Sequence, residues 1–252
     1  IIRNKTPLPH TLSEQLQYLQ EHPELSTVIT GYARKLNRQQ QAVNGIKHAV
    51  SLIGQDALPA IIAEARLFQA CQQLAQPHNT WLIQLINCLH QALLQLHSLS
   101  SFSDKAESAP AGLKVIAWCL ASPLWLNTAL SCSASVSAAG QLQIARHCIH
   151  QLWQSTTYPE QAKALLLYHG YPDWAHAVTL FRQANTRYPL DSQIAAIIHC
   201  AWYSACQSLF AIGLTGPELS RQLQALGYTS TSPASWLYQI LVETHAYCPT
   251  AP

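Results

Sequence analysis

Apolar residues recur every three or four positions along almost the whole chain, and this spacing is the feature that most constrains the fold. Positions three or four apart lie on one face of an α-helix, so each stripe predicts a helix with one buried face. No stretch shows the alternation of apolar and polar residues around hairpin turns that indicates β-strands. We therefore expect an all-α fold. The stripes lie at residues 43–53, 58–68, 82–96, 142–152, 174–181, 194–212, 219–226 and 237–244.

Glycine, proline and aspartate mark the places where these helices should begin and end. Gly54 follows the first stripe and predicts a helix end, because glycine commonly closes helices. Gly170 and Pro172 predict one helix end and the start of the next helix. Asp191 is the expected N-cap of the helix over residues 194–212.

Two stretches of small polar residues interrupt the stripes. Ser98–Gly112 is rich in serine and carries charged side chains, so it is expected to be an exposed loop or a sub-domain boundary. Ser131–Gly140 is a second soft stretch, small and polar. No repeat of fixed period is evident, which argues against a helical solenoid.

Charged residues make up only 10% of the chain, against roughly 25% in an average soluble domain. The formal net charge is +2 and no arginine-rich run occurs, so we expect no nucleic-acid binding. No uncharged apolar stretch reaches the ~18 residues that a transmembrane helix needs. We therefore expect no membrane contact.

The eight cysteines are interpreted as free thiols of a cytoplasmic protein. None of them forms a Cys-x-x-Cys pair, so zinc-ribbon and thioredoxin-type sites are not supported. Most fall inside apolar helical stripes, where a free thiol behaves as a small hydrophobic group. The residues from Ile1 to Lys5 show no apolar signal core. These observations predict a reducing, cytoplasmic environment.

The segment Pro23–Leu67 contains Ala33-Arg34-Lys35-Leu36-Asn37 and then a stretch from Ile46 to Gly54. The segment resembles the HDOD (HD-related output) family, whose Ile-x-x-Ala-(Ile/Val)-x-x-Leu-Gly element this stretch fits with Ile53 in place of the leucine. Thr6-Pro7-Leu8-Pro9 is similar to the proline-containing opening of the family. Looser similarity continues downstream at Trp81, Leu165–Val178, Ile194–Gly213 and the tail to His245. The resemblance implies a smaller N-terminal helical part, residues 1–75, packed on a larger HD-like helical part, residues 76–252.

The HDOD family resembles the HD phosphohydrolases, but the metal ligands of those enzymes are not found here. Their chemistry needs a histidine, an adjacent His-Asp pair and a later aspartate, which together hold divalent metal ions. None of the twelve histidines is followed by aspartate, and Ala117–Pro123, where the family has a histidine, contains no histidine and no carboxylate. We therefore expect no catalytic residues and no cofactor.

Five histidines remain as weak candidates for a rearranged metal site. His147 and His150 are three residues apart and share a helix face, and His169, His176 and His199 would have to converge on them in the folded bundle. The alternative, which we favour, is that all five are surface or half-buried groups. Three tryptophans could line a ligand pocket with their ring faces, namely Trp118, Trp125 and Trp153. We favour the alternative that they pack in the core.

The resemblance implies a non-catalytic bacterial signal-transduction or regulatory domain. Such a domain acts through an unidentified protein partner or through a small ligand in the degenerate cleft, whose binding residues the sequence does not identify. Two alternatives stay open, namely an HD-type metal-dependent phosphohydrolase with a rearranged site and a dimeric helical scaffold.

Overall fold

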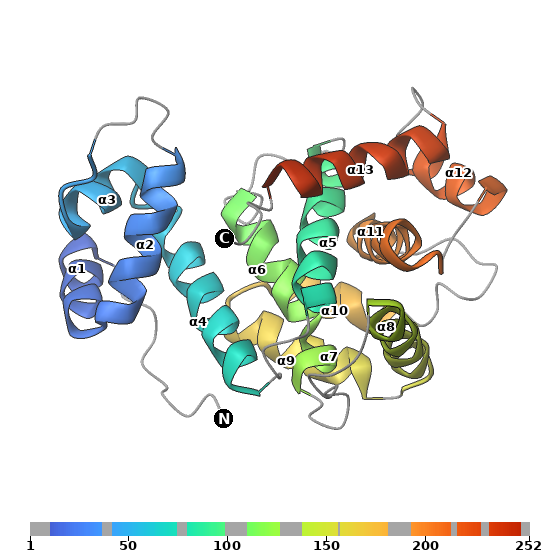
Figure 1. Ribbon diagram of the computed structural model, residues 1–252, viewed down its shortest axis with the longest axis horizontal. Coiled ribbons are helices and arrows are strands. Elements are labelled where there is room, and N and C mark those ends of the chain that lie inside the picture. The colour runs from blue at the N-terminus through green and yellow to red at the C-terminus, as the bar shows by residue number, and fades with distance from the viewer. Residues whose placement is uncertain are drawn as a thin grey trace. The chain divides into compact units, whose positions relative to one another are not determined.

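The expected all-α fold is confirmed by a computed structural model of the chain (Figure 1). The structure describes residues 11–36, 42–74, 80–98, 110–126, 138–155, 157–180, 193–212, 216–227 and 232–247. These residues form thirteen helices, and no strand occurs among them. None of the helices in these ranges combines the length and the apolar character that a membrane span requires.

The chain divides into two compact units, Ile1–Gln69 and Ala70–Pro252. The sequence analysis placed its boundary between residues 75 and 76, a few residues further along the chain. The first unit contains α1, α2, α3 and most of α4, whose bounds are Leu12–Glu21, Pro23–Leu36, Ile46–Ile53 and Leu58–Leu74.

In the first unit, α1 and α3 pack against α2 and against each other. Leu19 of α1 and the stripe Leu25, Ile29 and Ala33 of α2 are almost fully buried. Ala49 of α3 is also fully buried. Burying a leucine or isoleucine side chain contributes roughly 1.5–3 kcal/mol, so this small apolar centre holds α1, α2 and α3 together.

The second unit is built around α5, which lies between α6 and α11 (Figure 1). Helix α13 packs on both α5 and α11, and α9 and α10 form a closely packed pair that contacts α6 and α11. The core of this unit is dominated by α5, α6 and α11, which bury most of their length. The bounds of its helices are α5 Thr80–Ser98, α6 Pro110–Leu120, α7 Ser122–Leu126, α8 Ala138–Gln154, α9 Tyr158–Tyr168, α10 Pro172–Thr179, α11 Gln193–Phe210, α12 Gly216–Ala225 and α13 Pro233–Tyr247.

The helix ends that were predicted from glycine and proline are confirmed. Gly54 closes α3 at φ 88° and Gly170 follows α9 at φ 83°, a backbone region in which residues with a Cβ are strained. Pro172 is the first residue of α10. Asp191, the expected N-cap of α11, lies outside the described residues.

Helix extends into both small polar stretches, and their other residues, 99–109 and 131–137, lie outside the described residues. Helix α5 ends at Ser98, as expected, but α6 already begins at Pro110. Similarly, α8 begins at Ala138, before Gly140. In α6 the first position suits proline, because its missing N–H has no helical partner there anyway.

Candidate functional site

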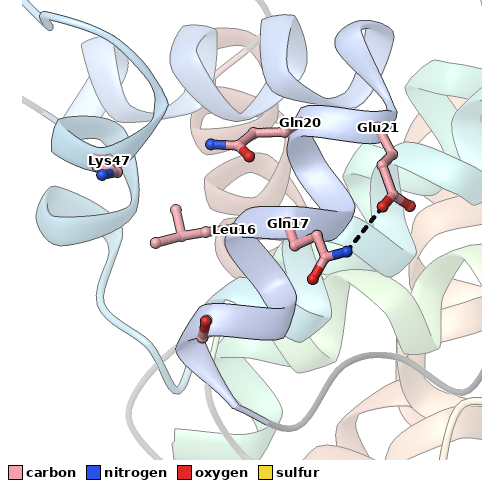
Figure 2. Close-up of a pocket in the computed structure, with 6 residues that line it drawn as sticks. Leu16, Gln17, Gln20, Glu21 and Lys47 are labelled. Atoms are coloured by element: carbon pink, nitrogen blue, oxygen red, sulfur yellow. Dashed lines mark hydrogen bonds between the residues drawn. The ribbon is translucent and has the colours of Figure 1, made fainter.

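An open groove of about 640 Å³ lies on the first unit between α1 and α3. Five of its lining residues come from α1 and the sixth, Lys47, from α3 (Figure 2). The residues on α1 recur at helical spacing, so they form one face of that helix. They are Ser13, Leu16, Gln17, Gln20 and Glu21.

The opposite face of α1, which is one wall of the groove, attaches the helix to the rest of the first unit. Gln15 and Leu19 are buried there, at 2% and 0% exposure. Tyr18 accepts hydrogen bonds from two guanidinium nitrogens of Arg66 on α4, with Nε at 3.0 Å from the Tyr18 hydroxyl oxygen. The Arg66 guanidinium carbon lies 4.8 Å from the centre of the Tyr18 ring. Helix α1 is therefore attached both by apolar packing and by a polar contact to a second helix.

Both ends of α1 are defined by hydrogen bonds. At its start, Thr11 accepts from the Glu14 backbone N–H at 3.3 Å, and the Glu14 carboxylate accepts from the Thr11 backbone N–H at 3.2 Å. This reciprocal pair is a capping box, which satisfies two backbone donors at the helix start. At its end, the Ser26 hydroxyl of α2 donates to the Leu19 carbonyl oxygen. These contacts set the direction in which the groove side chains project.

The groove is polar and carries one charge of each sign. The Gln17 side-chain amide donates to the Glu21 carboxylate at 3.1 Å, which Figure 2 shows as a dashed line. Lys47 lies across from Gln20 and Leu16 on the facing helix (Figure 2). All of these side chains except the half-buried Leu16 are exposed. A ligand in the groove would therefore meet amide, hydroxyl and charged groups around one apolar contact.

The five histidines predicted as metal candidates are not brought together. Within the described ranges, no group of three or more histidine, cysteine, aspartate or glutamate side chains is arranged to hold a metal ion. On α8, His147 and His150 are exposed, and the His150 ring nitrogen Nε2 lies 3.0 Å from the Gln154 amide nitrogen. His176 of α10 is also exposed.

The other two candidates have local structural roles. His169 is the C-cap of α9, and its backbone N–H donates to the Leu165 carbonyl at 3.0 Å. His199 is buried in α11, where its Nδ1 lies 2.9 Å from the Gln222 side-chain oxygen of α12. This pair links two helices of the second unit.

The tryptophans considered as pocket lining lie largely in the core. Trp118 and Trp125 are almost fully buried, and the Trp125 indole N–H donates to the Trp118 carbonyl at 3.3 Å. Trp153 is half-buried and stacks on Tyr203 with 4.7 Å between ring centres. Packing was the interpretation favoured from the sequence, and burial of the first two confirms it.

Resolved pKa shifts are found among groups of the second unit, and burial causes each of them. Burial raises the pKa of the Cys200 thiol to about 12, with an opposing hydrogen bond to Ser204. Burial also raises the pKa of the Tyr158 hydroxyl, and Cys206 and Tyr203 add to the rise. The pKa of His97 is lowered by burial. Shifts that desolvation alone dominates are typical of core groups.

The residues that line the groove were not identified from the sequence. The apolar stripes selected for helices begin at residue 43, and α1 lies before them. The available signals were the pattern Thr11-x-x-Glu14, which is typical of a helix start, and the helical spacing of Leu12, Leu16 and Leu19. Comparison of the chain with protein-family models, curated proteins and solved structures gives no match.

Proposed function

We propose that this chain is a non-catalytic regulatory module of HDOD type that binds a polypeptide segment of a partner protein. The binding site is the groove between α1 and α3, and the observation that carries the proposal is the chemistry of its lining. The resemblance of Ile46–Gly54 to the HDOD element supports the regulatory role, and Lys47 belongs to that element.

The lining suits a peptide backbone because its polar groups both donate and accept hydrogen bonds. The amides of Gln17 and Gln20 and the hydroxyl of Ser13 all have this double capacity. A peptide presents alternating N–H and C=O groups, so an extended segment can be paired along the exposed face of α1. Glu21 and Lys47 carry opposite charges and would fix the direction of the segment.

The size and openness of the groove agree with this ligand class. Ligand pockets span about 300–1,000 Å³, and the volume here falls within that range. The groove is open to solvent along α1, so a chain segment can enter and leave at its ends. Leu16 offers one apolar contact, which suits an apolar side chain of the bound segment.

The proposal includes a reducing cytoplasmic location. The six described cysteines are all buried free thiols, which agrees with a compartment where disulfides do not persist.

Peptide selection followed by calorimetry tests the proposal. Short random peptides are selected on the purified chain, and the affinity of the enriched peptides is measured for wild type and Lys47→Glu. We expect the variant to weaken binding by about tenfold, or about 1.4 kcal/mol. Arg221→Glu on α12 is the matched control, since Arg221 is exposed and the charge change is identical. Equal peptide affinity of Lys47→Glu and Arg221→Glu, or the absence of any enriched peptide, would refute the groove as the binding site.

The non-catalytic part of the proposal has a separate test. The purified chain is incubated with manganese or iron and its metal content is then measured by elemental analysis. We expect substoichiometric metal. Stoichiometric, tightly held metal would contradict this part and would call for a phosphodiesterase and nucleotidase screen.

A further inference from the structure

The face of α2 that points away from the core contains an unexplained glycine. Gly31 lies in the middle of a helix that runs from Pro23 to Leu36. A Cβ built on Gly31 has no heavy atom within 4 Å, and the residue does not occupy the positive-φ region. Glycine inside a helix costs roughly 0.5–1 kcal/mol relative to alanine. Neither steric room nor backbone conformation within the described chain requires glycine here.

An apolar side chain and two opposite charges flank Gly31 on the same face. Val28 precedes it by three residues and is 43% exposed. Glu24 lies in the first turn of α2, and the exposed Arg34 lies in its last turn. The buried stripe of α2 is formed by other residues, so these four positions belong to the outward-facing side.

We propose that this face of α2 is a homodimer interface in which the α2 helices of two copies pack antiparallel. Val28 of each copy fills the gap over Gly31 of the other copy. A glycine allows two helix backbones to approach closely, and the exposed valine supplies the apolar contact for that gap.

One register satisfies both the packing and the charges. When Val28 lies opposite Gly31 of the second copy, Glu24 is four residues before Val28, and Arg34 of the second copy is three residues beyond Gly31. In an antiparallel pair these two positions differ by one residue, or about 1.5 Å along the axis. Opposite charges therefore meet twice around the twofold axis, as an isologous interface requires. A parallel pair would instead bring like charges together.

The interface is expected to be weak. A single helix face buries less than the roughly 800 Å² per partner of a standard interface, so the dimer should form only at high protein concentration. Glu24 also contacts His22 at 3.2 Å within the same chain, but both side chains are partly exposed and such pairs contribute little.

Sedimentation equilibrium of the full chain from about 10 μM to about 1 mM tests the proposal. We expect an average mass that rises from 27.9 kDa toward twice that value. Glu24→Arg and Arg34→Glu should each raise the dissociation constant at least tenfold, and the double exchange should restore it to within about threefold of wild type. Glu160→Arg is the matched control, because Glu160 is an exposed acid in the first turn of α9.

Gly31→Gln tests the packing of Val28 over Gly31 separately from the pairing of Glu24 with Arg34. Glutamine favours helix and meets open space in the single chain, so helix content should be kept. In the dimer its side chain occupies the position of Val28 from the other copy, and we expect at least a tenfold rise in the dissociation constant. A single monomeric species at all concentrations would overturn the proposal. A dimer that neither Gly31→Gln nor the charge exchanges affect would overturn it equally.

Discussion

Replacing Tyr18 by phenylalanine isolates the hydrogen bonds that attach α1 to α4. Phenylalanine keeps the ring, so the position of the Arg66 guanidinium 4.8 Å from the ring centre and the ring contact with His22 remain available. Only the hydroxyl oxygen, which accepts from Arg66 Nε at 3.0 Å and from a second guanidinium nitrogen, is removed.

The magnitude follows from the charge and the burial of this contact. Hydrogen bonds to charged groups contribute about 1.5–3 kcal/mol when they are protected from water. Tyr18 and Arg66 are both only half-buried, and after the loss Arg66 can turn to solvent. Solvent screening therefore reduces the expected loss to about 1 kcal/mol in the free energy of unfolding.

Urea unfolding followed by far-UV circular dichroism measures this loss. All seven tryptophans lie beyond residue 69, so tryptophan fluorescence reports the second unit alone, whereas circular dichroism reports helices of both units. A dichroism change without a matching fluorescence change reports unfolding of the first unit. In Tyr18→Phe, the urea midpoint of this transition should be lower than in wild type. Tyr238→Phe is the matched control, because Tyr238 is 70% exposed and its hydroxyl should matter little. The reasoning is refuted if Tyr18→Phe is as stable as Tyr238→Phe.

Three further predictions concern the second unit. Burial lowers the pKa of His97, so below pH 6.5 the unfolded chain binds a proton that the folded chain excludes; stability should fall as pH drops through this range, and His97→Gln should flatten the slope in pH-dependent urea melts. Arg146 Nε donates to the Phe210 carbonyl at 2.7 Å, at the C-terminus of α11. Arg146→Ala should therefore lower stability by about 1 kcal/mol in thermal denaturation, whereas Arg221→Ala, also on an exposed arginine but in the middle of α12, should change it by less than about 0.5 kcal/mol. Burial raises the pKa of Cys200 to about 12, and the other five described cysteines are buried too. At pH 8 no more than two of the eight thiols should therefore react rapidly with a disulfide reagent, while all eight should react in urea. Rapid reaction of more than two thiols in the folded protein would contradict the buried placement.

Local patterns predicted the fold class because the apolar stripes have helical spacing and some of them end at a stop signal. Helix α3 is an example, since its apolar spacing ends at Gly54 and the glycine adopts the positive φ that closes the helix. By contrast, α1 was not predicted, although Leu12, Leu16 and Leu19 have helical spacing and Thr11-x-x-Glu14 is a capping pattern at its start.

The sequence did not predict which side chains from different helices lie close together in the fold. The spacing of His147 and His150 correctly implies a shared helix face, but that face is exposed to solvent. His199 is buried instead, beside Gln222 of the following helix. Which faces of separate helices meet depends on packing between elements, and no pattern within one helix specifies it. The groove between α1 and α3 has the same origin, because Lys47 becomes part of it only through the packing of α3.

Hydrogen–deuterium exchange with a selected peptide bound to the chain tests the central claim most directly. The account predicts that the peptide slows exchange in α1 and in the first turn of α3, which form the two walls of the groove. Lys47→Glu should reduce this protection at the same peptide concentration, because its affinity for the peptide is expected to be about tenfold lower. Protection confined to helices of the second unit, with α1 and α3 exchanging as in the free protein, would contradict the claim that the groove is the binding site.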